Sequence, residues 1–448
     1  MKIPARPPKL YETFERIAKQ DPSRLARLLA NPSMVDEKGR YLHWDDFRFK
    51  LGVEGISSEE AWVALKIARN AASQKIGITD TKGTEFTFSE PPKLKETLRH
   101  LDMNAGGSLA SDQQSLTSGE GKLYLTQSLA EEPFASSLIE GAATTRQIAK
   151  KLIFEGRSPR TKDELMVLNN YRALEFVKQR KDDPLTIGMI LELHKLVTDG
   201  TMDNPRDSGR VRSSDDVQVV DDSSGEILHQ PPSHLELSSR LVDLVNFANS
   251  SNHGGLWIHP LVRAFILHFL LSYEHPFVDG NGRVARALFY WLAIREGYWL
   301  IEYVSISSVI AESKIQYGKS FLHVETDDAD LTYFLIYNAK ILETAISRLI
   351  SYVDRRKNEL SAFESRLSDR SQRDGFNHRQ SWVLNEMARG RLPRINISTH
   401  ADRQGVAYLT ARADLEDLTV RALLRKTKVG RESIYSPARD LLSRLTTG

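Results

Sequence analysis

The sequence predicts a mainly α-helical fold with one small β-hairpin and a separate C-terminal module. Apolar residues recur at helical spacing through most of the chain, for example at 58–73 and from 331 to about 356. In the central region of the chain, two short strand-like runs around a polar turn interrupt this pattern at 217–229. The final residues, 381–448, carry 12 Lys and Arg against 7 Asp and Glu, which marks a change of module.

The composition is that of an ordinary globular protein. The chain has 448 residues, 40% apolar and 27% charged, with a net charge of only +2, so it is not a nucleic-acid binder over its whole surface. The absence of cysteine excludes disulfides, thiolate metal ligands and thiol nucleophiles, and fits the cytoplasmic location that we expect. No signal-peptide core is visible at the N-terminus.

Segment 261–277 is the most apolar part of the chain. It is interrupted by Arg263, His268, Glu274 and His275, so we expect a buried helix and no membrane partner.

Changes in composition suggest the domain organisation. Residues 1–105 form a helical region without an assigned role, and a Gly/Ser-rich stretch at 104–121 is typical of a flexible connection. A large helical core is expected at 125–356, followed by a polar linker or exposed helical extension at 357–380. The basic module occupies 381–448.

The segment from His275 to Arg286 reads His-Pro-Phe-Val-Asp-Gly-Asn-Gly-Arg-Val-Ala-Arg and lies between two expected helices. Its glycines allow backbone N–H groups to converge at a helix N-terminus, which creates an anion cradle. Arg283 and Arg286 are three residues apart, so we expect both to project to one side. Two guanidinium groups beside such a cradle indicate a polyphosphate ligand.

Two further side chains suggest catalysis at this cradle. Asp279 precedes it, and a carboxylate beside phosphates is best explained by a bridging Mg²⁺. His275 is expected at the end of the preceding helix, where an imidazole suits general-base chemistry. Phe277 is expected to point inward and anchor the loop.

This segment resembles the signature of the Fic family, His-x-Phe-x-(Asp/Glu)-Gly-Asn-Gly-Arg-x-x-Arg, at all eight defined positions. The resemblance implies a Fic-type helical core and a protein adenylyltransferase (AMPylator). Such an enzyme transfers AMP from ATP to a Ser, Thr or Tyr hydroxyl of a target protein, and here also of itself. The roles implied are a base at His275, Mg²⁺ at Asp279, the α- and β-phosphates at Gly280, Asn281 and Gly282, the β-phosphate at Arg283, the γ-phosphate at Arg286, and adenine near Tyr317.

The hairpin at 217–229 matches the Fic flap in place and character. An exposed strand edge pairs with a target backbone and presents its hydroxyl to the nucleotide. An ordinary surface hairpin is the alternative. The segment Gly209-Arg-Val-Arg212, just upstream, also looks familial. The expected docking residues are Val217, Gln218, Val219, Val220, Ile227 and Leu228.

Ser136-Ser-Leu-Ile-Glu-Gly141 resembles the Fic inhibitory motif, (Ser/Thr)-x-x-x-Glu-(Gly/Asn). Ser136 and Glu140 are four apart and share a helix face. The resemblance implies that Glu140 pairs with Arg286, which then cannot grip the γ-phosphate, so that ATP binds with its α-phosphate misoriented. Some Fic enzymes use this glutamate to remove AMP, and that activity stays open here.

The C-terminal module looks like a winged helix-turn-helix, with a helix at 381–389, a helix-turn-helix at 398–418 and a basic hairpin at 423–435. Negative charge from Asp414, Glu416 and Asp417 argues against DNA binding, and a protein-interaction or dimerisation module is the alternative. If the module binds DNA, the contacts are Tyr408, Thr410 and Arg412 on the recognition helix and Arg425, Lys426, Lys428 and Arg431 on the wing.

Two other functions stay open. A Fic enzyme can transfer UMP, phosphocholine or the γ-phosphate instead of AMP. A DNA-binding regulator could use the core only to sense nucleotide, although a sensor needs neither His275 nor Asp279. The sequence leaves homodimerisation and the target protein undetermined.

Overall fold

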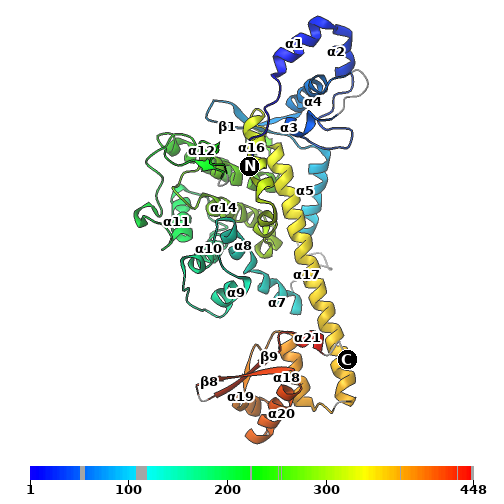
Figure 1. Ribbon diagram of the computed structural model, residues 1–448, viewed down its shortest axis with the longest axis vertical. Coiled ribbons are helices and arrows are strands. Elements are labelled where there is room, and N and C mark those ends of the chain that lie inside the picture. The colour runs from blue at the N-terminus through cyan, green and yellow to red at the C-terminus, as the bar shows by residue number, and fades with distance from the viewer. Residues whose placement is uncertain are drawn as a thin grey trace. The chain divides into compact units, whose positions relative to one another are not determined.

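The computed structural model describes residues 1–50, 56–106, 119–221, 224–250, 252–253, 255–373, 375–430 and 432–444 (Figure 1). The chain divides into two compact units. The first comprises Met1–Ser108 and Leu129–Ser347, and the second comprises Leu109–Ser128 and Arg348–Gly448. Within the described ranges, helices dominate, the sheets have two or three strands, and no helix is both long and apolar enough to cross a bilayer.

The N-terminal part of the first unit differs from the purely helical region that the sequence predicts. It contains an antiparallel hairpin, and α4 begins at a capping box in which the Ser57 side chain and Glu60 satisfy each other's backbone N–H groups. The elements are α1 (Leu10–Gln20), α2 (Pro22–Leu29), α3 (Trp44–Phe47), α4 (Ser58–Ala72), β1 (Gln74–Thr79), β2 (Glu85–Phe88) and α5 (Pro92–Ala105).

Residues 1–105 are not a separate domain, because buried polar contacts join them to the helical core. Lys66 Nζ lies 2.5 Å from an Asp327 carboxylate oxygen, and both side chains are almost fully buried. The buried Arg69 guanidinium donates to the Tyr333 hydroxyl at 2.7 Å. The pair of Lys66 and Asp327 is costly to separate, since each partner alone leaves an uncompensated buried charge.

Two consecutive helices form the centre of the first unit. Helix α13 (Pro260–Glu274) begins with proline at its first position and has 13 buried residues, and α14 (Asn281–Arg295) packs directly against it. Helix α10 packs against both α14 and α8 (Figure 1). The other elements of this core are α8 (Glu131–Ile139), α9 (Arg146–Phe154), α10 (Lys162–Gln179), α11 (Ile187–Thr198), η1 (Pro205–Asp207), α12 (Leu237–Asn249), β5 (Asn252–His253), β6 (Leu256–Trp257), η2 (Trp299–Tyr303), α15 (Ile306–Ile310), η3 (Ala311–Ser313) and α16 (Lys314–Thr326).

The expected hairpin at 217–229 is present but shorter than the sequence pattern indicates. Strands β3 (Val219–Val220) and β4 (Ile227–His229) are antiparallel, with Val219 opposite His229 and Val220 opposite Ile227. Residues 217 and 218 precede the first strand, and residues 222 and 223 lie outside the described part of the chain.

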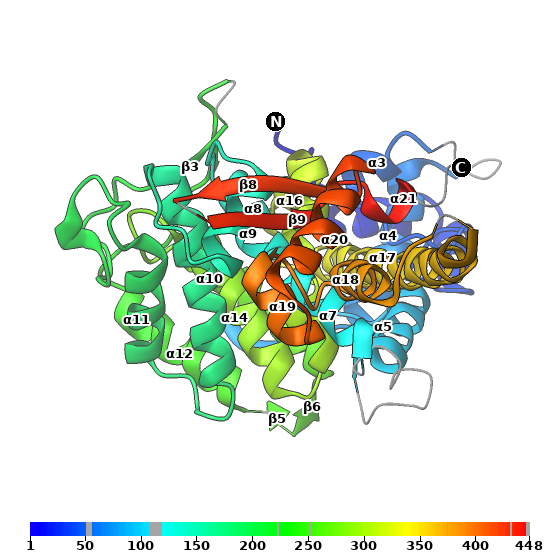
Figure 2. The ribbon, with the colours of Figure 1, turned by 90° about the horizontal axis from the view of Figure 1, so that it is seen from below.

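The second unit contains the expected helix-turn-helix and basic hairpin as secondary structure. Helix α19 (Ile397–Gln404) ends at Gly405, which has the left-handed φ of 65° that favours glycine, and α20 (Tyr408–Val420) follows. Strands β8 (Leu424–Val429) and β9 (Glu432–Pro437) form the hairpin beside α20 (Figure 2). Strand β7 (Ile395–Asn396) completes a sheet of order β7-β9-β8. The unit also contains α7 (Gly119–Ser128), α18 (His378–Ala388) and α21 (Leu441–Arg444).

The segment at 357–380, for which the sequence left a linker or an exposed helical extension open, is mostly helical. Helix α17 (Thr332–Arg373) continues through most of it, and Leu360, Phe363 and Leu367 are buried in the core of the second unit. Apolar residues at this helical spacing form a stripe that packs against a core. In the sequence, the many charged residues around them make this stripe hard to recognise. The Gly/Ser-rich connection lies mainly at 107–118, outside the described residues.

Candidate active site

His275 ends α13 in a backbone conformation that non-glycine residues rarely adopt, with φ of 45°. Its Nδ1 lies 3.2 Å from the Ser272 carbonyl oxygen, so Nδ1–H donates there and Nε2 keeps its lone pair. Burial lowers the pKa of His275 to about 4, partly offset by this hydrogen bond. The imidazole is therefore neutral at neutral pH and able to accept a proton.

The bend before α14 is built around Gly280, whose φ of 87° is unfavourable for any other residue. The Asn281 side chain accepts from the Phe277 N–H at 2.9 Å and donates to the Phe277 carbonyl at 2.8 Å, which closes the bend. No side chain caps α14. Its first-turn N–H groups are therefore available to an anion, as the sequence predicts.

His194 supports this bend and was missed in the sequence analysis. Its ring stacks on Phe277 with centroids 3.8 Å apart, Nε2 donates to the Asp279 carbonyl at 2.9 Å, and Nδ1 accepts from the Gly209 N–H at 3.0 Å. Burial lowers the pKa of His194 to about 4. A histidine within the apolar pattern of α11 was the available signal. The expected inward position of Phe277 is confirmed by its complete burial.

Arg212 joins the catalytic bend to the flap. Its buried guanidinium donates from Nε to the His275 carbonyl at 3.1 Å and contacts the Pro232 carbonyl just after β4. It also forms an ion pair with Asp215. The backbone N–H of Arg212 donates to the Pro276 carbonyl at 2.9 Å. The Gly209–Arg212 segment is thus a structural connection between both parts of the site.

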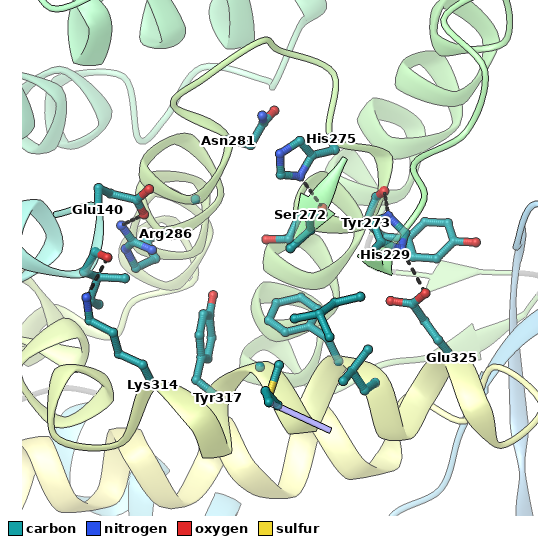
Figure 3. A pocket seen from close by; sticks show the side chains of 18 residues that line it. Glu140, His229, Ser272, Tyr273, His275, Asn281, Arg286, Lys314, Tyr317 and Glu325 are labelled. Atoms are coloured by element: carbon teal, nitrogen blue, oxygen red, sulfur yellow. Dashed lines mark hydrogen bonds and ion pairs between the residues drawn. The ribbon is translucent and has the colours of Figure 1, made fainter. Parts of the chain in front are cut away.

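A cavity of about 290 Å³ brings together some of the predicted site residues (Figure 3). His275, Asn281 and Gly282 line one wall, and Arg286 and Tyr317 line another. The flap contributes Val219 and Leu228, and the side chain of Met1 also lines the cavity. Val220 and Ile227 are each 46% exposed, as a docking edge requires.

Arg286 is engaged by the motif at 136–141. Its Nη2 donates to a Glu140 carboxylate oxygen at 2.8 Å, and its Nε donates to the Ser136 hydroxyl at 3.0 Å. Glu140 follows the last residue of α8. A Cβ on Gly282 would lie 2.6 Å from the same Glu140 oxygen, so only glycine permits this approach.

Arg283 and Asp279 lie differently from the sequence prediction. Arg283 does not project with Arg286, because its buried guanidinium donates to the Val197 carbonyl at 2.8 Å and to Asp279 at 2.9 Å. Neither residue lines the cavity, and neither does Gly280. Asp279 keeps its side chain 55% exposed. Arg283 thus fixes the orientation of Asp279 in this conformation.

The described residues contain no group of three or more metal-ligating His, Asp or Glu side chains. A single accessible carboxylate fits Mg²⁺, which takes one or two carboxylates and completes its octahedron with phosphate oxygens and water. Asp279 is therefore compatible with a metal that arrives with a nucleotide.

Tyr317 and Lys314 both reach the cavity from α16. The Tyr317 hydroxyl lies 2.8 Å from Nε2 of the buried His268, and burial raises the pKa of Tyr317. Lys314 was not identified from the sequence, which offered no signal for it. On the other side of the cavity His229, at the end of β4, pairs with Glu325 at 2.8 Å (Figure 3).

The comparisons with known proteins agree with this geometry. The model of the Fic/DOC family matches residues 184–293, which include the flap, α13 and the catalytic bend. Protein adenylyltransferase fic-1 of Caenorhabditis elegans is 32% identical over 233 residues, covering 51% of this chain and 41% of that protein. Protein adenylyltransferase Fic of Nematostella vectensis is 31% identical, covering 37% of each.

The chain thus spans less than half the length of these curated relatives. Among solved structures, a Fic family protein from Desulfovibrio desulfuricans G20 is similar at 18% identity and a TM-score of 0.48, covering 78% of this chain and 95% of that one. Residues 184–293 are thus the part of this chain that matches the Fic/DOC family.

Proposed function

We propose that this protein is an adenylyltransferase that moves AMP from ATP to a Ser, Thr or Tyr hydroxyl of a target protein and of itself. The observation that carries the proposal is the shared cavity, where the neutral His275 faces the uncapped N-terminus of α14 and Arg286. A base beside a polyphosphate cradle suits nucleotidyl transfer, whereas simple nucleotide binding needs no base. The relatives named as protein adenylyltransferases support the same activity.

The reaction needs one proton acceptor and one anion site. Nε2 of His275 takes the proton of the target hydroxyl while its oxygen attacks the α-phosphorus of ATP. The new bond joins that oxygen to the α-phosphorus, and the bond from the α-phosphorus to the bridging oxygen breaks, so pyrophosphate leaves. The N–H groups at the start of α14 stabilise the charge on the phosphates.

Asp279 would hold the Mg²⁺ that neutralises phosphate charge when bound. The hydrogen bond from Arg283 keeps the Asp279 carboxylate oriented at the entrance to the bend.

The protein is proposed to be autoinhibited. Glu140 and Ser136 occupy the guanidinium that a γ-phosphate would otherwise bind. Removing Glu140 takes away one of the two side chains that hold Arg286 and reopens the space above Gly282, which lies next to the carboxylate.

The decisive experiment incubates the wild type, Glu140→Gly and Glu140→Gly/His275→Ala with Mg²⁺, lysate and labelled ATP. Glu140→Gly is expected to incorporate label from the α-position and none from the γ-position, well above the wild type. The double variant should bind ATP but incorporate label more slowly by a factor on the order of 10²–10⁴, the contribution of a general base. No incorporation by Glu140→Gly, with or without lysate targets, contradicts the proposal. Incorporation from the γ-position would instead indicate a kinase.

A second candidate function is DNA binding by the C-terminal module. The three acids that argue against it on α20 are all engaged inside the module. Asp414 pairs with Arg379, Asp417 with Arg421, and Glu416 with Lys426. The exposed face of α20 retains the candidate contacts Tyr408, Thr410 and Arg412, whereas Arg431 lies outside the described residues.

A further inference from the structure

Lys314 contacts the C-terminal end of the inhibitory helix α8, next to Glu140. Its Nζ donates to the Leu138 carbonyl at 3.0 Å and to the Ile139 carbonyl at 2.8 Å. These are among the last carbonyls of α8, which have no partner further along the helix. A cation there also interacts favourably with the negative end of the helix dipole.

The opposite end of α8 is anchored independently. The buried Glu132 accepts from the Ser307 N–H at 3.0 Å and from the hydroxyls of Ser305 and Ser307. In the middle of the helix, Ser137 donates to the Pro133 carbonyl and accepts from Asn170. The first turns of α8 therefore stay attached when Arg286 changes partner, and movement must occur at the end that carries Glu140.

Glu140 comes directly after the two carbonyls that Lys314 binds. Its carboxylate is 23% exposed and reaches Arg286 from a backbone that has already left helical geometry. Figure 3 shows Lys314 on the same side of the cavity as the pair of Glu140 and Arg286. The position of the Glu140 carboxylate over Gly282 thus depends on the position of Leu138 and Ile139, whose carbonyls Lys314 binds.

We propose that Lys314 is a positioning residue for inhibition: it fixes the C-terminal end of α8 so that Glu140 stays on Arg286. This inference rests on the proposed function, since it concerns the regulation of the same site. Lys314 is itself exposed, so its two hydrogen bonds to the end of α8, which we call the clamp, are weak enough to break reversibly. A lysine at a helix C-terminus contributes a fraction of the interaction energy of a buried ion pair, which suits a reversible control.

The test compares Lys314→Met with Lys314→Arg in the full chain. Methionine keeps most of the apolar stem and removes the donor, whereas arginine keeps the charge and the donors. Lys314→Met is expected to raise α-label incorporation about two- to five-fold over the wild type, the range that a helix-end cation supports. Lys314→Arg should remain close to the wild type. Lys319→Met is the matched control, because Lys319 lies on the same helix and donates no hydrogen bond to α8 among the described contacts.

A double variant separates positioning from a general loss of structure. In the Glu140→Gly background, Lys314→Met should give no further rise, because there is no carboxylate left to position. An equal rise in both backgrounds, or no rise with the wild-type glutamate while Glu140→Gly is active, would overturn the proposal.

Hydrogen exchange tests the clamp without any catalysis. The amides of Gly141 and Ala142 donate to the Leu138 and Ser137 carbonyls and should exchange faster in Lys314→Met. Amides at the start of α8 should be unchanged, since Glu132 holds that end. Unchanged exchange at both ends would disprove the clamp even if the protein transferred no AMP, so this failure is distinct from that of the proposed function.

Discussion

The side chain of Arg212 donates from Nε to the backbone carbonyl of His275 at 3.1 Å, so the residue that precedes the flap holds the backbone of the proposed base. Its other donors reach the Ser214 and Pro232 carbonyls, on either side of the hairpin. Flap and catalytic bend therefore share one buried cation. A change in the position of one is transmitted to the other through a rigid guanidinium.

Arg212→Met is expected to uncouple the flap from the bend. Buried carbonyls lose their donor, and the misplaced base and docking edge should lower AMP transfer in the Glu140→Gly background on the order of ten- to hundred-fold. Initial rates with α-labelled ATP measure the effect. Arg210→Met is the control, because Arg210 is exposed and only two residues away. Equal losses in both variants would contradict a specific role for Arg212.

The pH dependence of kcat/KM should reflect the lowered pKa of His275. The base acts only when neutral, and burial places its pKa at about 4, so activity should persist as the pH falls below 6 and decline toward 4. The profile is obtained by measuring rates of the Glu140→Gly protein between about pH 4.5 and 8, in steps of roughly half a pH unit. Recovery of activity after return to pH 7 controls for unfolding. An acidic limb centred near the ordinary histidine value of about 6.5 would be inconsistent with a buried neutral base.

His194 should make the first unit sensitive to acid. The pKa of His194 is about 4 in the folded protein, below its value in the unfolded chain. The contribution of His194 to the free energy of unfolding is therefore present above the unfolded pKa and is lost as the pH falls through the folded pKa. Between pH 7 and 5 this amounts to a loss on the order of 2 kcal/mol in the free energy of unfolding. Urea unfolding of the wild type and His194→Gln at both pH values measures it. The variant should lose less stability on acidification, and identical losses would exclude His194 as the cause.

The wing offers a matched pair of lysines for testing DNA binding. Lys426 is paired with Glu416, whereas Lys428 is exposed on the same strand and has no ion pair among the described residues. If the module binds DNA, Lys428→Met should weaken binding and reduce the slope of log K against log salt by about 1, and Lys426→Met should change it little. Gel retardation over a salt series measures both. Absence of any retardation by the intact protein at low salt would dismiss DNA as the ligand.

Local chemistry made much of the site predictable from the sequence. A bend with positive φ favours glycine, as at Gly280. The helix that begins after such a bend leaves its first N–H groups without helical partners in any fold. The spacing of Ser136 and Glu140 put both on one helix face, and both contact Arg286. Helical periodicity likewise predicted α4, α13 and α14 within a few residues.

The tertiary structure decided which partner each charged side chain meets. Arg283 and Arg286 follow the same bend on one helix, but only Arg286 reaches the cavity, because α11 offers the Val197 carbonyl to Arg283. Lys314, His194 and Arg212 contact segments distant in sequence, so local patterns did not reveal which groups these side chains hold, even where they marked the Gly209–Arg212 segment. The sequence by itself determined the chemistry that the bend can perform, since that depends on residue types and backbone freedom. The tertiary structure alone decided which side chains orient and restrain it, since hydrogen bonds and burial depend on packing between segments far apart along the chain.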